Sequence, residues 1–196
     1  MRTLYNILTI IASFIVKLLA LSNKKLKLGV EGRKQTFSKL RKSINATDNV
    51  IWCHCASLGE YEQGLPVFEK LKEKYPDYRL VLSFFSPSGY EIRKKSPIAD
   101  CVVYLPLDTK QNAKRFLDIV NPKLVFFVKY EIWPNYLNEI KKRSIEAYLI
   151  SALFKKEQAF FNWKGAWMRK YLKAFTHIFT QNEASKDLLN SYSFEN

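Results

Sequence analysis

Residues 50–60 read VIWCHCASLGE, a short apolar run that passes directly into small residues and a glutamate. A run of this kind, rich in β-branched and aromatic side chains, is typical of a buried parallel strand. Similar runs follow it at Leu80–Phe85, Cys101–Leu105, Leu124–Val128, Ala147–Ile150 and His177–Thr180. Helical patterns separate the runs, as in Tyr61–Lys74 and Asn135–Arg143. This alternation predicts an α/β fold with a Rossmann-like, doubly wound parallel sheet over residues 49–196.

The composition is that of a folded, basic chain. Its 196 residues are enough for one domain with its own core, and 47% of them are hydrophobic. The 32 Lys and Arg residues against 18 Asp and Glu give a net charge of +14. The expected partners are therefore anionic: nucleic acid, phospholipid head groups or a phosphorylated substrate.

Cysteine and glycine patterns limit the chemistry that we expect. The three cysteines form no paired framework, which fits a reducing compartment. Cys53, His54 and Cys55 invite a metal hypothesis, but adjacent residues on a strand point to opposite faces and no second ligand cluster follows. We therefore expect no metal site and two small buried thiols in a core strand. The glycine-rich phosphate loops of dinucleotide-binding proteins and ATPases are not found in the sequence.

The first residues of the chain are predicted to bind a membrane. Residues 4–21 are almost entirely apolar and close to the ~20 residues that cross a bilayer as a helix. We expect residues 1–23 to form a membrane-anchor helix that spans the bilayer or inserts deeply. The alternative is a helix in the membrane interface, because four polar residues would share one stripe. These are Asn6, Thr9, Ser13 and Lys17.

Residues 24–48 are predicted to be a basic connector between this helix and the sheet. By the positive-inside rule, its charges leave the globular part in the cytoplasm. A cleaved signal peptide competes with this interpretation, but Lys17 within the apolar run and the basic cluster behind it argue against export. Several basic side chains could attract a phosphate, although each alone is more typical of a solvated surface. These are Arg33, Lys34, Lys39, Arg41 and Lys42.

The candidate site lies in the loops that follow the strands, because ligands bind beside the carboxyl ends of a doubly wound sheet. Glu60 falls in the first turn of a predicted helix, and Gly59 would permit a tight turn before it. The helix dipole would favour an ionised Glu60, which could accept a proton from an attacking hydroxyl. Glu131, after the fourth strand, could orient Glu60 or that hydroxyl. The simpler alternatives are a surface role for Glu60 and helix capping before Pro134 for Glu131.

The motifs in these loops occur in the order and spacing of a known family. They are HCASLGE (54–60), SPSG (86–89), LPLD (105–108), EIWPN (131–135) and QNE (181–183). With them the chain resembles the bacterial transferases of 3-deoxy-D-manno-octulosonic acid (Kdo) over nearly its whole length. The resemblance implies the N-terminal domain of a two-domain GT-B glycosyltransferase at the cytoplasmic face of the inner membrane. It also implies inverting transfer of Kdo from CMP-Kdo to lipid IVA, in lipopolysaccharide biosynthesis, without a metal or other cofactor.

The resemblance assigns roles to individual residues. Glu60 matches the general base and Glu131 a second important acidic residue. Five small residues match positions that line the acceptor or the cleft between domains: Ser57, Gly59, Ser86, Ser88 and Gly89. The chain departs from the family at Lys129, where many members have an acidic residue. It also stops at Asn196, where the family continues into a donor-binding domain, so residues 1–196 alone are expected to be inactive.

Two other functions are compatible with the sequence. One is a GT-B transferase that acts on a different lipid-linked acceptor. The other is a membrane-tethered nucleic-acid-binding module, which the sequence pI of about 9.6 would allow. Its basic residues are dispersed and no recognition motif is present, so we expect no nucleic-acid partner.

Overall fold

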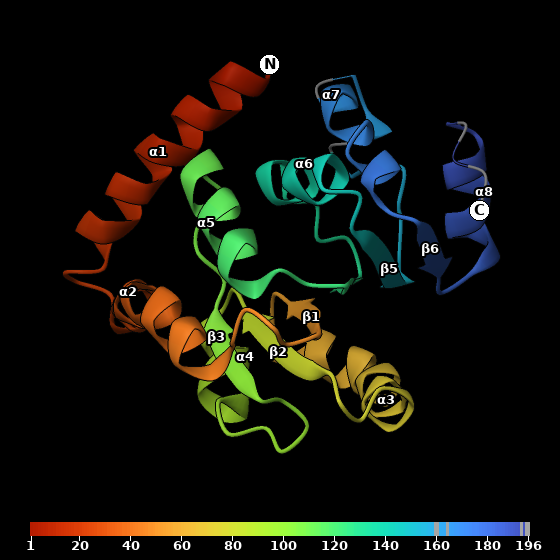
Figure 1. The fold of residues 1–196 in the computed structure, drawn as a ribbon. Helices are drawn as coiled ribbons and strands as arrows, with labels where there is room; N and C mark the ends of the chain where they lie inside the picture. Colours follow the sequence, from red (N-terminus) through yellow and green to blue (C-terminus); the bar gives the residue numbers. More distant parts are fainter. Residues whose placement is uncertain (159–160, 164, 193, 195–196) are drawn as a thin grey trace.

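A parallel sheet forms the centre of the computed structural model, which describes residues 1–158, 161–163, 165–192 and 194. Within these residues, six parallel strands lie in the order β3-β2-β1-β4-β5-β6 (Figure 1). They are β1 (Val50–Cys55), β2 (Arg79–Phe84), β3 (Cys101–Tyr104), β4 (Leu124–Val128), β5 (Glu146–Ala152) and β6 (His177–Thr180). The predicted doubly wound fold is confirmed, and the predicted strand ends differ by two residues at most.

Helices cover both faces of the sheet (Figure 1). One face packs against α3 (Leu58–Lys74) and α4 (Pro87–Arg93). The other face packs against α5 (Lys110–Val120), α6 (Pro134–Lys142), the short η2 (Leu172–Ala174) and α8 (Glu183–Asn190), with α7 (Ala166–Arg169) beside them. Each face has its own apolar cluster, because successive side chains of a strand point to opposite sides.

Strand β1 shows how this alternation separates neighbouring residues. Trp52 packs in the cluster under α5 and α6, whereas Cys53 and Cys55 pack under α3. Both thiols are free and fully buried, and burial raises the pKa of each well above its ordinary value. The prediction of buried core thiols is therefore confirmed. Among the residues that the structure describes, no group of three His, Cys, Asp or Glu side chains is placed to hold a metal ion.

The predicted basic connector is largely a helix, α2 (Lys24–Ser43), which covers the edge strand β3. The side chain of Asn23 caps it by accepting from the Leu26 N–H at 3.1 Å. On its inner face the Thr36 hydroxyl donates to the Tyr104 carbonyl at 2.8 Å, and Leu40 is fully buried. Since an uncovered edge strand offers unpaired backbone groups to other chains, α2 protects this side of the sheet.

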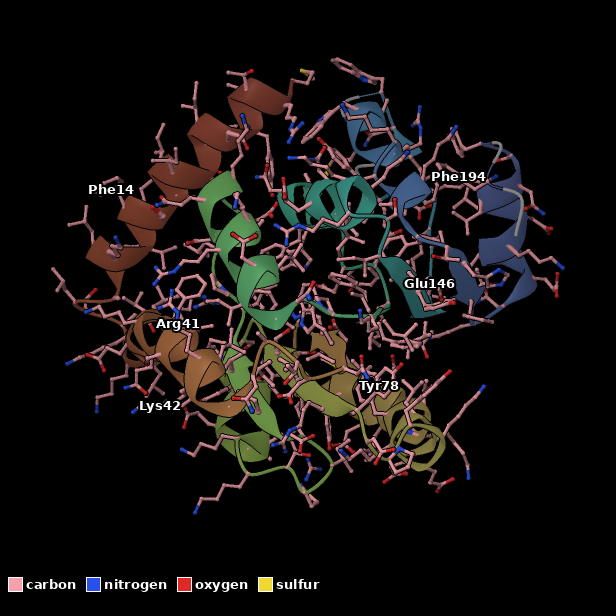
Figure 2. All side chains as sticks on the ribbon, in the orientation of Figure 1. Phe14, Arg41, Lys42, Tyr78, Glu146 and Phe194 are labelled. Carbon is pink, nitrogen blue, oxygen red and sulfur yellow. The ribbon has the colours of Figure 1, made fainter. Side chains whose placement is uncertain are left out.

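Arg33 on α2 is a structural residue and not a solvated surface charge. Its Nε donates to the Leu105 carbonyl at 2.9 Å and its Nη2 to the Phe85 carbonyl at 2.6 Å, which satisfies backbone groups just beyond β3 and β2. The guanidinium also lies 4.6 Å from the centroid of the Phe85 ring. Burial lowers the pKa of Arg33 to about 10. In contrast, Arg41 and Lys42 project into solvent from the end of the helix (Figure 2).

Helix α1 (Arg2–Leu19) lies along the outside of the domain and has no buried residue. By length and composition it could cross a membrane. Phe14 points away from the domain (Figure 2), and its apolar neighbours on the exposed side are about half exposed. These are Leu4, Ile7, Leu8, Ile10, Ile11, Ile15, Leu18 and Leu19.

Asp108, the last residue of LPLD, connects α1 to the start of α6. Its carboxylate accepts from the Tyr5 hydroxyl at 2.7 Å and from the backbone N–H groups of Asn135 and Tyr136 at 3.0 and 3.1 Å. The Asn135 amide in turn donates to the Asn6 side chain at 2.9 Å. The start of α1 is thus held on the domain by polar contacts that also cap α6.

Replacing Gly32 by alanine should destabilise the fold, because the added Cβ would overlap the Tyr104 ring where α2 covers β3. Overpacking of this kind costs ~1–3 kcal/mol. We expect a lower urea midpoint for Gly32→Ala, while Gln35→Ala at an exposed position of the same helix stays close to the parent protein. Equal midpoints for the two variants would mean that α2 does not pack on β3 in this way.

Candidate functional site

The candidate site lies where the strand order reverses. From β1 the chain passes through α3 to β2 on one side, and from β4 it passes through α6 to β5 on the other. Strands β1 and β4 are neighbours, with His54 in register with Phe127. Doubly wound sheets bind ligands between the loops that follow such a pair of strands, and we call the region between the β1 and β4 loops the crevice. Glu60 follows β1 and Glu131 follows β4, so both predicted catalytic residues are at this crevice.

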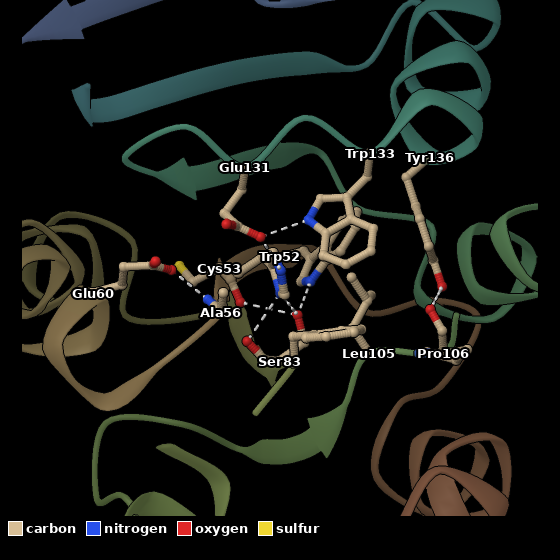
Figure 3. Close-up of polar contacts among 12 residues, drawn as sticks. Trp52, Cys53, Ala56, Glu60, Ser83, Leu105, Pro106, Glu131, Trp133 and Tyr136 are labelled. Carbon is tan, nitrogen blue, oxygen red and sulfur yellow. Dashed lines mark hydrogen bonds and ion pairs between the residues drawn. The ribbon is translucent and has the colours of Figure 1, made fainter. Parts of the chain in front are cut away.

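Glu60 is held close to the backbone at the start of α3. It is the third residue of the helix, and only 6% of its surface is exposed. One carboxylate oxygen accepts from the Ala56 N–H (Figure 3), a reach back across the N-terminus like that of a capping-box glutamate. The N-cap residue Ser57 makes no side-chain cap. The alternative of a simple surface residue is wrong.

The environment of Glu60 favours its protonated form. Burial and, secondly, the charge of Glu131 raise its pKa from 4.5 to about 7. Hydrogen bonds from the Ala56 and Ser57 backbone and the charge of Lys129 act in the opposite direction but are smaller. We expected the helix N-terminus to favour the ionised form of Glu60. That expectation is wrong, because desolvation raises the pKa of Glu60 more than the helix dipole lowers it.

Glu131 lies across the crevice from Glu60, on the loop between β4 and α6 (Figure 3). Its Oε2 accepts from the indole N–H of Trp133 at 2.8 Å and lies 3.5 Å from Nε2 of His54. The alternative of helix capping is wrong for Glu131, because Asp108 receives the first N–H groups of α6. The Glu131 carboxylate is thus left for the crevice.

Lys129 stands at the turn out of β4. Its φ of 68° is in the left-handed region, which costs a non-glycine residue of order 1 kcal/mol. The backbone N–H still donates to the Ile150 carbonyl at 2.9 Å, so the turn is anchored to β5. The Lys129 charge lowers the pKa of Glu60 and partly offsets the effect of Glu131.

Gly59 does not form the predicted tight turn. No glycine of the described residues has a positive φ, and Gly59 is an ordinary residue of the first turn of α3. A Cβ built on Gly59 would meet no atom within 4 Å. The glycine therefore leaves open space over the N-terminus of α3, beside Ser57 and Glu60. A ligand could approach the backbone here more closely than at any larger residue.

The SPSG loop packs against this same helix start. Ser86 caps α4, with its Oγ accepting from the Ser88 N–H at 3.3 Å. Gly89 is buried, and a Cβ there would overlap the Phe84 ring and lie 3.1 Å from the Leu58 nitrogen. Gly89 is thus required for close packing of α4 on β2 and α3. Ser86 and Ser88 remain partly exposed, so they are the members of this loop that a ligand could contact.

A buried polar group that the motifs did not predict lies beneath the site. His54 and Ser83 are fully buried, and the Trp52 indole donates to Ser83 Oγ at 2.7 Å (Figure 3). One sequence signal was available, since His54 and Ser83 are polar residues inside runs that otherwise read as buried strands.

Comparisons with known proteins agree with the motifs. Residues 31–196 match the family model described as 3-deoxy-D-manno-octulosonic-acid transferase. The chain is 33% identical over 119 residues to such a transferase of Aquifex aeolicus, covering 59% of this chain and 33% of the relative. It is 30% identical over 156 residues to one of Rickettsia felis, covering 78% of this chain and 33% of the relative. The matches thus span about a third of each relative's length.

A solved structure shares the fold. The UDP-GlcNAc 2-epimerase of Neisseria meningitidis, bound to UDP-GlcNAc, aligns with a TM-score of 0.54 and 16% identity. The alignment covers 75% of this chain and 44% of the epimerase. At this identity the likeness concerns the fold alone, and it agrees with the parallel sheet described above.

Removing the carboxylate of Glu60 should change how stability depends on pH. With a folded pKa of about 7 against an ordinary 4.5, Glu60 stabilises the fold below pH 4.5, and this contribution is lost as the pH rises to about 7. The difference corresponds to at most about 3 kcal/mol. We expect Glu60→Gln to be clearly more stable than the parent at pH 8 but not at pH 5, measured by thermal unfolding.

The control is Glu69→Gln, which changes an exposed carboxylate of the same helix. Its stability relative to the parent should not depend on pH in this window. A Glu60→Gln variant that behaves like this control would show that Glu60 titrates normally.

Proposed function

This chain belongs to the Kdo transferase family, and from that premise we propose that it is the acceptor-side half of a glycosyltransferase that moves Kdo from CMP-Kdo to lipid IVA. The observation that carries the proposal is the pair of carboxylates at the point where the strand order reverses, the buried Glu60 and the partly buried Glu131. In the proposed enzyme a second domain binds most of CMP-Kdo, and residues 1–196 alone are inactive.

In the proposed reaction, Glu60 is the general base. An acceptor hydroxyl gives its proton to the Glu60 carboxylate while its oxygen forms a bond to the anomeric carbon of Kdo. The bond from that carbon to the phosphate oxygen of CMP breaks, and CMP leaves with the electron pair. Because the hydroxyl attacks opposite to CMP, the configuration inverts. The step requires no cofactor beyond the donor.

The pKa of about 7 supports this role for Glu60. A general base is most effective when its pKa is close to the working pH, since it is then both available and basic. Glu131 contributes by its charge, which is the second-largest cause of the raised pKa. Its position across the crevice also supports a contact with the acceptor or donor sugar.

Helix α1 supports attachment to a membrane, which we propose is the inner membrane at its cytoplasmic face. Its exposed apolar side would enter the lipid, and the chain's net charge of +14 suits an anionic surface and a phosphorylated acceptor. The bonds of Tyr5 and Asn6 to the domain favour the interface arrangement over the spanning one. A helix that crossed the bilayer would have to break both.

The proposal is tested in a two-domain protein, formed by residues 1–196 and a donor-binding domain from the downstream reading frame or a curated relative. We expect Glu60→Gln to lower kcat for Kdo transfer to lipid IVA by about a hundredfold or more. In the parent, the rate should rise with pH through about 7, as Glu60 loses its proton. In Glu131→Gln this rise should move to lower pH, because a charge that raises the pKa of Glu60 is gone.

The exposed Glu69→Gln change again serves as the control and should leave the rate and its pH profile unaltered. Undiminished transfer by Glu60→Gln would contradict the assignment of the base. If the two-domain parent transfers Kdo to another lipid-linked sugar but not to lipid IVA, the assignment of lipid IVA as the acceptor is wrong.

Alanine at position 59 should separate function from folding. The new Cβ enters open space and removes a helical glycine, so stability should rise by up to ~1 kcal/mol. The same methyl group would occupy the space over the start of α3 that we assign to a substrate, so transfer should fall by roughly tenfold or more. A matched control is Gly64→Ala, also in α3, where the Cβ would overlap Phe68 and stability should fall. Full activity in Gly59→Ala would show that the substrate does not occupy this space.

A further inference from the structure

A chain of buried polar side chains lies under the Glu131 carboxylate. It consists of Trp52 and His54 on β1 and Ser83 on β2, all with no exposed surface. The His54 ring is packed edge-on against Phe127 and Trp133, at centroid distances of 5.5 and 5.8 Å. Its Nε2 is buried and has no hydrogen-bond partner among the described residues, yet it faces Glu131 Oε2 at 3.5 Å.

The hydrogen on the Ser83 hydroxyl has one favourable direction. The Trp52 indole N–H can only donate, and it donates to Ser83 Oγ at 2.7 Å. Ser83 is therefore the acceptor in that bond, and its own O–H points elsewhere. Two acceptors are within reach: His54 Nδ1 at 2.9 Å and the Cys53 carbonyl at 3.5 Å. The shorter contact to Nδ1 is the stronger hydrogen bond.

This direction determines the tautomer of His54. If Nδ1 accepts from Ser83, the proton of the neutral ring is on Nε2, and Glu131 Oε2 is 3.5 Å from that nitrogen. In the other tautomer Nδ1 would donate to the Ser83 carbonyl at 3.1 Å, and a bare Nε2 lone pair would face the carboxylate. In a buried site that repulsion is poorly screened, so the first arrangement is favoured.

We propose that His54 is a positioning residue for Glu131, with a proton on Nε2 that Ser83 and Trp52 keep in place. The effect on catalysis rests on the proposed function, whereas the contacts of His54 with Glu131 and Ser83 do not depend on it. His54 and the Trp133 indole both act on Oε2 of Glu131, and no hydrogen bond from a described residue reaches Oε1. The carboxylate is therefore held by one oxygen and presents the other to the crevice.

The first test observes the tautomer in residues 1–196 themselves. The chain has only two histidines, so long-range proton–nitrogen NMR spectra contain two rings, and the His177→Gln variant identifies the signals of His54. We expect a protonated Nε2 and, in the neutral ring, a bare Nδ1. In Ser83→Ala the ring should shift toward the tautomer that donates from Nδ1 to the residue 83 carbonyl. A bare Nε2 in the parent protein would overturn the proposal.

The second test compares two replacements in the two-domain protein. His54→Gln places an amide that can donate near the position of Nε2, whereas His54→Leu keeps an apolar side chain of similar reach. We expect kcat to fall roughly tenfold or more in His54→Leu and to be largely restored in His54→Gln, with KM for lipid IVA changed less than kcat. Equal rates in the two variants would overturn the positioning role, because the donor would then have no effect.

A third test observes the Glu131 side chain directly and does not depend on Kdo transfer. Crystal structures of residues 1–196 should show the Glu131 side chain in the same rotamer in His54→Gln as in the parent, and rotated in His54→Leu. If the two-domain parent transfers no Kdo, the proposed function fails while the tautomer and this rotamer still decide the role of His54. An unmoved Glu131 in His54→Leu would count against it.

Discussion

The parallel pairing of β1 with β4 is the constraint on which the candidate site depends. Because β2 occupies the other side of β1 and β5 the other side of β4, the chain must leave these two strands in opposite directions. The two loops separate at the carboxyl edge and cannot fill the space between them. Residues that are 71 positions apart, Glu60 and Glu131, therefore come to face one crevice.

Burial gives Glu60 its chemistry. A glutamate in the first turn of a solvated helix would be a stabilising charge, but Glu60 is turned against the backbone beside a second carboxylate. The resulting free-energy cost is stored at the site and is tolerated because the sheet and its two apolar clusters hold the fold. Beneath Glu131, Trp52 contacts Ser83, Ser83 contacts His54, and His54 lies against the Glu131 carboxylate.

Helix α1 and the site share a support. Asp108 receives the start of α6 and the Tyr5 hydroxyl of α1, and α6 follows directly on the loop that carries Glu131. Arg33 gives a comparable anchor on the other side, where α2 binds carbonyl groups beyond β2 and β3. The positions of α1 and α2 on the domain are thus set by buried or partly buried polar side chains of Asp108 and Arg33.

The sequence by itself determined the strands, their alternation with helices and, from that, their parallel direction. It also determined the buried thiols of β1 and the edge of the sheet at which polar residues gather. These features follow from local apolar periodicity, which records the burial of each segment. Only the tertiary structure decided that Glu60 is buried, that Asp108 and not Glu131 caps α6, that the basic segment after α1 is a helix on β3, and that Gly59 opens space. The physical reason is that desolvation, capping from a distant loop and packing against a sheet edge arise between residues far apart in the chain, where periodicity carries no information.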